Sequence, residues 1–385
     1  MEQSKQEPVF RIGPIRPPSE ANSLLLQVTQ GCTWNKCKFC ELYQDTKFRA
    51  FSADSIKQDI DAIAYYAEKA KPFIHGDGTF DRIGLNRILS SMEPQAQNCF
   101  SMVVNWLLGG GQTVFLQDGN TLALQNGRLS DVLSYLKQTF PQITRITSYG
   151  RAESLSRISA EEYAELHAAG LTRIHSGFES GSDQVLQLIH KGVTAQQEIQ
   201  AGKNIKAGGI EFSVYFMPGV GGKALSQENA RGMAEVVSEI DPDFVRIRTA
   251  AIKPGTQLYE DFLAGHFELC TDDEKVLEIK TLIEQSHCER ASIVSDHIIN
   301  LLPHIMGSLG RDKAVLLGII EEYLSLPTLD RRLYQLLRRY NAAESVSDLS
   351  KLSASERSRL EEICRQTDSD AIWAEQMNSL IARYV

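Results

Sequence analysis

Residues 23–40 read SLLLQVTQGCTWNKCKFC, and this stretch decides the fold that we expect for the rest of the chain. Its first part, Ser23–Thr29, predicts a buried strand, because a short apolar run bounded by polar residues is typical of one. Three cysteines follow within nine residues, Cys32, Cys37 and Cys40, in a C-x4-C-x2-C spacing. The sequence therefore places three thiols on one loop after a predicted strand, where they can converge on a single metal centre.

A [4Fe-4S] cluster suits this loop, because such clusters are held by cysteine thiolates and three ligands leave one iron open. Lys36 and Lys38 would offset part of the negative charge of the cluster. A structural zinc site is a second interpretation, but zinc wants four ligands, usually in two separated pairs. The sequence has no second C-x2-C pair, and the nearest histidine along the chain is His75. Three unrelated thiols are the third interpretation.

The whole chain has 385 residues and seven cysteines, with 40 Lys and Arg against 49 Asp and Glu, which gives a net charge of −9. An odd number of cysteines disfavours a disulfide framework. We expect the four scattered ones, Cys99, Cys270, Cys288 and Cys364, to be packed thiols. The acidic balance disfavours a nucleic-acid groove, which needs a basic face. No apolar run is long enough to span a membrane and no signal peptide is evident, so we expect a cytoplasmic protein.

Predicted strands and helices alternate about six times between residues 22 and 250, which is typical of βαβ units that build a parallel sheet. The fold class is therefore α/β, with an N-terminal lead over residues 1–21 and a six-unit domain over 22–267. Residues 71–110 are expected to form helices and turns. Residues 268–385 are predicted to be helical, with one helix over Val294–Met306 that carries His297 and Asn300 on one face.

The cysteine loop at the end of the first strand, with Phe39 before the last cysteine, resembles that of the radical S-adenosylmethionine (SAM) enzymes. It differs from their commonest spacing by one residue, with four rather than three residues between Cys32 and Cys37. The resemblance covers roughly residues 20–265 and is nearest to the methylthiotransferase and Elongator-3 groups. It implies a partial (βα)6 TIM-like barrel, with Cys32, Cys37 and Cys40 as ligands of a [4Fe-4S] cluster whose open iron binds SAM.

The same resemblance implies that SAM contacts lie on the loops after the strands. The segment after strand two would contact the amino group of SAM, Arg151 its carboxylate, Glu179 its ribose or amino-acid end, and the segment around Met217 its adenine. Each has a plainer alternative: an Asp-Gly turn, a solvated arginine, a helix cap and a simple turn. Arg248 shares one side of strand six with Arg246, and either faces the substrate or pairs with loop carboxylates. The cofactor-binding residues implied are Phe39, Gln117, Asp118, Gly119, Asn120, Ser148, Arg151, Glu179, Ser180, Met217 and Arg248.

The resemblance implies that the cluster splits SAM reductively into methionine and a 5′-deoxyadenosyl radical, which abstracts hydrogen from a substrate. We expect a small-molecule substrate and a flavodoxin or ferredoxin as electron donor. The short lead before Cys32 predicts no cobalamin domain there, and no compact basic β-domain follows the barrel, which counts against tRNA methylthiolation. Modification of RNA or a peptide is an alternative activity. A non-catalytic electron-transfer or metal-binding protein is another.

Overall fold

A mainly parallel sheet forms the frame of the protein, in the strand order β1-β4-β5-β6-β7-β8-β9-β10. The pairs β1–β4, β4–β5, β5–β6, β7–β8 and β8–β9 are parallel, whereas β9–β10 is antiparallel. The predicted α/β class, with parallel strands separated by helices, is confirmed. The strands are β1 Leu24–Gln27, β4 Thr113–Gln117, β5 Arg145–Tyr149, β6 Arg173–Glu179, β7 Glu211–Phe216, β8 Phe244–Ile247, β9 Ser292–Val294 and β10 Gly307–Ser308.

The computed structural model describes residues 7–75, 79–367 and 369–384. Residues 1–6 of the predicted lead, and residues 76–78 of the stretch 71–110, therefore lie outside the described part. The chain divides into two compact units. The first holds the residues up to Thr33, then Asp45–His175 and Asn204–Glu211; the second holds Trp34–Gln44, Ser176–Lys203 and the residues from Phe212 onward.

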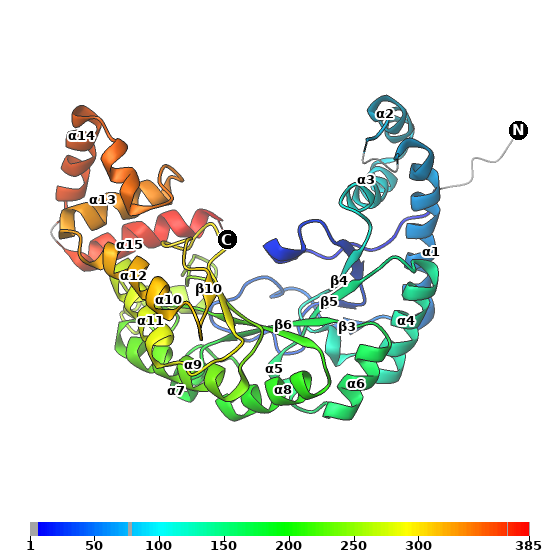
Figure 1. Cartoon of the computed structure of the whole chain (residues 1–385), viewed down its shortest axis with the longest axis horizontal. Coiled ribbons are helices and arrows are strands. Elements are labelled where there is room, and N and C mark those ends of the chain that lie inside the picture. Colours follow the sequence, from blue (N-terminus) through cyan, green and yellow to red (C-terminus); the bar gives the residue numbers. More distant parts are fainter. Residues whose placement is uncertain (1–6, 76–78, 368, 385) are drawn as a thin grey trace, which may run out of the picture. The chain divides into compact units, whose positions relative to one another are not determined.

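In the first unit, helices cover strands that are buried along their length, as expected for parallel strands with both faces covered. Helix α1 packs on α3, α4 and β1, and α4 packs on α6, so that α1, α4 and α6 lie side by side (Figure 1). The expected helices within residues 71–110 are present as α2 and α3. The helices of this unit are α1 Ala53–Ala70, α2 Arg82–Ser90, α3 Pro94–Leu108, α4 Asn126–Thr139, α5 Ala152–Leu155 and α6 Ala160–Ala168.

A buried charge cluster stands at the amino ends of the strands of the first unit. Glu20 is fully buried and accepts hydrogen bonds from Ser23 at 2.5 Å and Arg145 at 3.3 Å. Burial alone would raise the pKa of Glu20, but hydrogen bonds from His175 and Ser23 and the charge of Arg145 outweigh it and lower the pKa to about 2. Polar residues at this end of a parallel sheet serve stability, since ligands bind at the opposite end.

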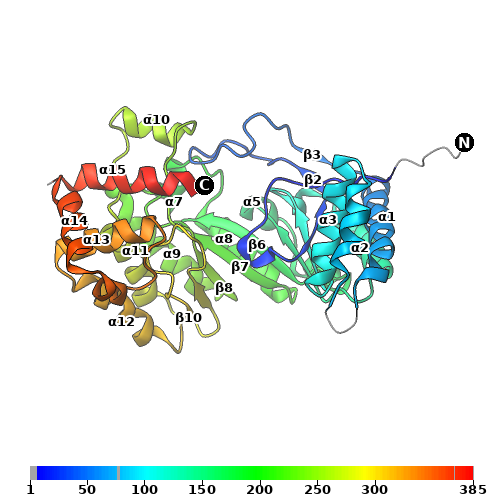
Figure 2. The same cartoon turned by 90° about the horizontal axis from the view of Figure 1, so that it is seen from above.

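In the second unit, α9 packs on α7 and α11, α11 packs on α12, and α13 packs on α14 and α15. Figure 2 shows α13, α14 and α15 grouped together. Helix α8, Ala195–Ala207, belongs partly to each unit. The other helices are α7 Asp183–Leu188, α9 Ser226–Ile240, α10 Gln257–Leu263, α11 Asp272–Gln285, α12 Lys313–Leu324, α13 Thr328–Arg339, α14 Ala354–Arg365 and α15 Asp370–Ile381.

Short elements complete the chain. Strands β2 Thr29–Gln30 and β3 Arg49–Ala50 pair antiparallel and bracket the segment that contains the cysteines. The 3-10 helices are η1 Pro18–Glu20, η2 Lys71–Phe73, η3 Thr121–Ala123, η4 Lys223–Leu225, η5 Val346–Lys351 and η6 Ala382–Tyr384. Among the described residues, no helix is both long and apolar enough to cross a membrane.

One predicted helix is wrong. Residues 295–306 form no helix, and Val294 ends strand β9 instead. Asn300 is held by the strand next to it in space: its Oδ1 accepts from the Thr249 backbone N–H at 3.1 Å, and its Nδ2 donates to the Ile247 carbonyl at 2.8 Å. These bonds fix an irregular loop at the carboxyl end of β8, where the sequence predicts a helix face.

Candidate functional site

Asp118, the first residue after β4, fixes the backbone at the start of the cysteine loop. Its Oδ2 accepts a hydrogen bond from the backbone N–H of Gly31 at 3.0 Å. Gly31 has φ of +81°, a conformation that side-chain-bearing residues rarely adopt. Asp118 is fully buried, and this burial raises its pKa to about 6, although donors from Gly31, Gln27 and Gly119 oppose the shift. The turn that presents Cys32 is therefore held by a buried carboxyl.

Asn120 joins the cysteine loop to the loop after β5. Its Nδ2 donates to Thr33 Oγ1 at 2.9 Å and to Ser154 Oγ at 2.8 Å, and its Oδ1 accepts from the Arg151 backbone N–H at 3.0 Å. This bond orients the segment that carries the Arg151 side chain, whose Nη1 lies 3.9 Å from Cys32 Sγ. Four predicted site residues, Cys32, Asp118, Asn120 and Arg151, thus come together in the first unit.

Three other predicted residues of this unit lie near that group. The buried side chain of Gln117 makes hydrogen bonds to the N-terminal segment. Its Nε2 donates to the carbonyls of Gly13 at 3.1 Å and Ile15 at 2.7 Å. Ser148 is also buried and donates to the Tyr149 carbonyl at 3.2 Å. Gly119 is partly exposed at the turn after Asp118. The side chains of Gln117 and Ser148 both make hydrogen bonds to backbone carbonyls, which indicates that they stabilise the loops.

The second half of the cysteine loop is anchored to the segment after α7. The Lys38 backbone N–H donates to the Ile189 carbonyl at 2.9 Å, and Trp34 Nε1 donates to the His190 carbonyl at 2.6 Å. The Trp34 ring packs on Gly192, where an added Cβ would overlap it. These contacts fix the backbone on either side of Cys37.

The two lysines of the loop have defined neighbours. Lys38 Nζ is paired with Asp261 at 2.6 Å, and Lys36 Nζ lies 5.1 Å from the centre of the Trp34 ring. The positive charge of Lys38, which is predicted to offset negative charge at the cysteines, is therefore already paired with Asp261.

Phe39 and Met217, both predicted to contact SAM, belong to one apolar cluster. Met217 is buried and Phe39 is partly buried against it, together with Ile189 and Leu258. The cluster also contains Ala374 of α15. Close by in sequence, Asn378 of α15 binds both backbone groups of Ile252, accepting from its N–H at 2.9 Å and donating to its carbonyl at 2.6 Å.

Glu179 lies at the carboxyl end of β6 in an unusual conformation, with φ of +68°. It pairs with Lys191, with 2.9 Å between Oε1 and Nζ, and both side chains are largely buried. Lys191 Nζ also lies 5.5 Å from the centre of the Phe39 ring. Ser180 is buried and its Oγ accepts from the Ser182 backbone N–H at 3.1 Å, which indicates a turn.

Lys191 is a residue that the sequence analysis missed. The only signal available was the unmatched charge of Glu179, since a buried carboxylate requires a cation or several donors. The lysine lies beyond an intervening helix, so sequence spacing alone does not indicate the pairing.

The last predicted residue, Arg248, follows β8 and is partly buried. In the described part of the chain, no acceptor contacts its guanidinium, although Arg246 pairs with Asp296 at 2.7 Å. His297 is nearby: burial first, and then the positive charge of Arg248, lower the pKa of His297 to about 4, against the opposing effect of Asp296. A cation without a counter-ion and a neutral imidazole thus stand near the carboxyl end of β8.

The seven cysteines differ in exposure. All seven are thiols; Cys32, Cys37 and Cys40 are partly exposed, whereas the other four are buried. Burial raises the pKa of Cys99 and Cys270, and raises that of Cys364 to about 11, so these thiols stay protonated. Within the described ranges, no group of three His, Cys, Asp or Glu side chains could hold a single metal ion. An iron–sulfur cluster spreads its cysteine ligands over several irons, so it does not require three of these side chains to meet at one ion.

Comparison with curated proteins finds short matches. The chain is 28% identical over 120 residues to the tRNA uridine(34) acetyltransferase of Methanocaldococcus infernus, covering 31% of this chain and 22% of that protein. It is 26% identical over 185 residues to an uncharacterized methyltransferase of Pyrococcus horikoshii, covering 48% of this chain and 39% of that protein. The chain thus spans well under half the length of these relatives. No family model matches the chain.

Among solved structures, the chain is similar to the cobalamin-dependent S-adenosylmethionine radical enzyme OxsB. The identity is 16%, the TM-score is 0.39, and the match covers 93% of this chain and 46% of OxsB. The names of such matches are those of radical SAM enzymes, the class that the cysteine loop is predicted to resemble.

Proposed function

We propose that this protein is a radical SAM enzyme, with Cys32, Cys37 and Cys40 as the ligands of a [4Fe-4S] cluster. When bound, the cluster and SAM supply an electron and a 5′-deoxyadenosyl radical that removes hydrogen from a substrate. The observation that carries this proposal is the convergence of Asp118, Asn120 and Arg151 on the Cys32 end of the loop. Loops at the carboxyl ends of parallel strands are where such enzymes place their chemistry.

The residues of the site have separate tasks under this proposal. Asp118 and Asn120 hold the cysteine loop and orient the Arg151 segment, and the Arg151 guanidinium offsets negative charge at Cys32 or binds the SAM carboxylate. Phe39 and Met217 offer an apolar surface suited to the adenine. Lys191 pairs with Glu179, and the carboxylate of Glu179 would accept hydrogen bonds from the ribose hydroxyls or the amino-acid end of SAM.

The deciding experiment is anaerobic reconstitution of the full chain with iron and sulfide. We expect about four irons per chain, and release of 5′-deoxyadenosine when dithionite or reduced flavodoxin and SAM are added. Cys37→Ala should abolish both iron binding and SAM cleavage. Cys364→Ala, which changes a buried thiol far along the chain, should retain both. A protein that binds zinc and leaves SAM intact would contradict the proposal.

The net charge of −9 supports a small-molecule substrate. Arg248 is the residue we assign to a negatively charged group of that substrate, because a partly buried guanidinium without a counter-ion favours an anion.

RNA is the second candidate substrate, and the printed name of the Methanocaldococcus relative favours it. Binding to phosphates weakens steeply as salt displaces counter-ions. Fluorescence anisotropy with labelled tRNA at about 50 and 200 mM salt tests this candidate. Tight binding at the lower salt that weakens by orders of magnitude at the higher one supports RNA. Absence of binding at either salt supports the small molecule.

A further inference from the structure

Two consecutive arginines end helix α13, and both are buried. Arg338 is 6% exposed and Arg339 is 4% exposed. Burying a guanidinium is costly unless a counter-ion and hydrogen-bond acceptors replace the lost water. The two side chains meet this requirement to very different degrees.

Arg339 has an ionic partner, although its Nε, like that of Arg338, has no acceptor. Its Nη2 lies 2.6 Å from Oδ2 of Asp272, a carboxylate that is itself 2% exposed, and its Nη1 donates to the Ile299 carbonyl at 2.6 Å. Asp272 also faces Lys275, with 3.4 Å between Oδ1 and Nζ. This single carboxylate therefore already serves two cations.

Arg338 has no such partner. Its Nη1 and Nη2 each make one long hydrogen bond of 3.4 Å, to Asn341 Oδ1 and to the Ile298 carbonyl, and its Nε has no acceptor. In the described part of the chain, no carboxylate lies within 4 Å of its guanidinium. Burial, together with the charge of Arg339, lowers the pKa of Arg338 against the opposing effects of Tyr334 and of the more distant Glu344 carboxylate. The carbonyls at the end of α13 favour a cation, but they do not occupy its N–H donors.

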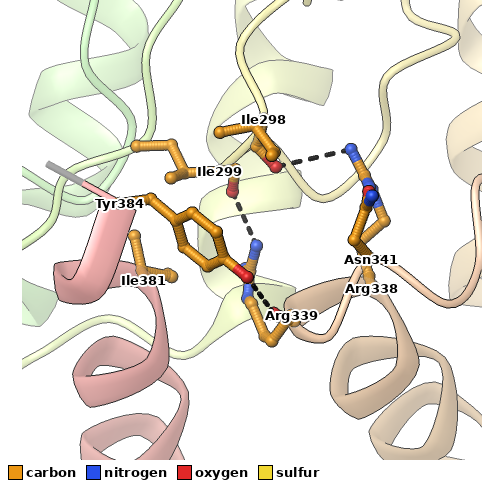
Figure 3. Close-up of a pocket in the computed structure, with 7 residues that line it drawn as sticks. All are labelled: Ile298, Ile299, Arg338, Arg339, Asn341, Ile381 and Tyr384. Carbon is orange, nitrogen blue, oxygen red and sulfur yellow. Dashed lines mark hydrogen bonds between the residues drawn. The ribbon is translucent and has the colours of Figure 1, made fainter.

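The unsatisfied guanidinium lines a small hollow (Figure 3). Arg338, Arg339 and Asn341 supply its polar lining, and Ile298, Ile381 and Tyr384 its apolar lining. Ile298 is 47% exposed and Tyr384 46% exposed, so the hollow is open to water at its rim. Its free volume of about 10 Å3 is room for about one water molecule, so a larger ligand would enter with its charged end only.

We propose that this hollow is a carboxylate-binding site, with Arg338 as the residue that binds the anion. A carboxylate is planar, and its two oxygens match the two-pronged donor geometry of a guanidinium. The small volume favours it over the larger tetrahedral phosphate. The exposed side chains of Ile298 and Tyr384 suit a short apolar body attached to the carboxylate. The site is independent of the cysteine loop and of the activity proposed for it.

The test is thermal unfolding of the full chain, with sodium acetate or sodium isobutyrate replacing sodium chloride at constant ionic strength and pH 7.5. Ligands that bind only the folded state raise Tm in a saturable way. We expect a saturable rise in Tm with both carboxylates and a larger one with isobutyrate, because of its apolar body. Arg338→Met should abolish the rise, whereas Arg359→Met, at an exposed arginine of the same region, should retain it.

A second comparison separates a binding site from a structural role. Replacing an uncompensated buried charge by an apolar residue of similar size is often neutral or stabilising. In chloride alone, Arg338→Met should therefore unfold at a temperature no lower than that of the wild type. Should this variant fail to fold, isothermal titration of Arg338→Lys replaces it, with weaker isobutyrate binding expected because the planar fork is lost. The proposal is overturned if carboxylates raise the Tm of the wild type and of Arg338→Met equally. It is also overturned if chloride, phosphate and acetate have the same effect on Tm, which would mean an adventitious ion only.

Discussion

At the scale of single residues, the buried carboxyl of Asp118 makes stability depend on pH. Its folded-state pKa of about 6 lies above its ordinary value of 3.8. The stability it contributes is therefore fully present below pH 4 and is lost as pH rises through 6. Asp118→Asn keeps an acceptor for Gly31 but cannot ionise. We expect it to gain up to about 3 kcal/mol in unfolding free energy at pH 8 and almost nothing at pH 4.

Urea unfolding of the metal-free protein at the two pH values measures this difference. Asp45→Asn, at an exposed carboxylate of the same unit, is the matched control and should show little change at either pH. A gain that is equal at pH 4 and pH 8 would contradict a role for ionisation. Iron content of the same variant reports whether the negative charge of Asp118 is also needed at the cysteine loop.

The pair of Lys191 and Glu179 supports a prediction with an internal control. Lys191→Met leaves the largely buried Glu179 without its cation, and breaking such a pair costs about 3 kcal/mol or more. We expect a large loss of stability and weaker SAM binding. The double variant Lys191→Met with Glu179→Gln should recover most of the stability but not the SAM affinity.

A double-mutant cycle on unfolding free energies, run beside SAM titrations, distinguishes the two effects. Additive stability losses would show that the two side chains do not interact. Recovery of both stability and SAM affinity in the double variant would remove Glu179 from the proposed SAM site.

The positions of residues at the carboxyl ends of strands could be predicted from the sequence. Cys32, Asp118, Asn120 and Arg151 all follow strands recognisable by their apolar runs, and parallel neighbours bring these ends together. Lys191 could not be predicted, because it reaches Glu179 across the turn after α7. The hydrogen bonds from Gln117 to the N-terminal segment could not be predicted either, since residues 13–15 carry no pattern that indicates where they pack.

At the scale of elements, the second half of the cysteine loop depends on one glycine. Gly192 has φ of +66°, and the Trp34 ring lies against the place of its missing Cβ. Gly192→Ala should displace Trp34 and strain the backbone, with a loss of about 1–3 kcal/mol in stability and reduced iron binding after reconstitution.

Gly127→Ala is the matched control, because an added Cβ there meets no atom within 4 Å. Iron content and urea unfolding of the two variants should be compared side by side. If Gly192→Ala binds iron as well as Gly127→Ala, the packing of Trp34 does not position the loop.

The elements after β8 show where pattern analysis fails. Val294, Ile298, Leu301 and Ile305 recur at helical spacing, and the sequence therefore predicts a helix. The structure instead pairs β9 with β8 and holds residues 295–306 as a loop. Two side-chain bonds from Asn300 to the backbone after β8 stabilise that loop, and Pro303 disfavours a continuous helix. Three-residue strands such as β9 leave too little periodicity to detect.

At the scale of the whole molecule, buried carboxyls with opposite shifts predict a narrow stability optimum. Glu20 has a pKa lowered to about 2, so its contribution is lost as pH falls from 4.5 towards 2. Glu278, whose carboxylate binds Gly219, Ser226 and Asn229, has a pKa that burial raises to about 7. Its contribution is lost as pH rises through 7, and that of Asp118 as pH rises through 6.

We therefore expect the metal-free protein to be most stable near pH 5, although the lowered pKa of His297 partly offsets the decline up to pH 6.5. Urea unfolding measured between pH 3 and pH 9 tests this. Glu278→Gln should flatten the alkaline side of the curve and leave the acid side unchanged. A wild-type optimum above pH 7 would contradict the assignment.

The contact of α15 with the apolar cluster around Phe39 bears on how the protein is made. Phe39 emerges from the ribosome early, whereas Ala374 and Asn378 emerge more than three hundred residues later. The packing around Phe39 and the backbone bonds of Ile252 are therefore complete only after α15 has been synthesised. Until α15 has been synthesised, the cysteine loop packs against an incomplete apolar cluster. Under the proposed function, we expect iron and sulfide to be inserted after that point.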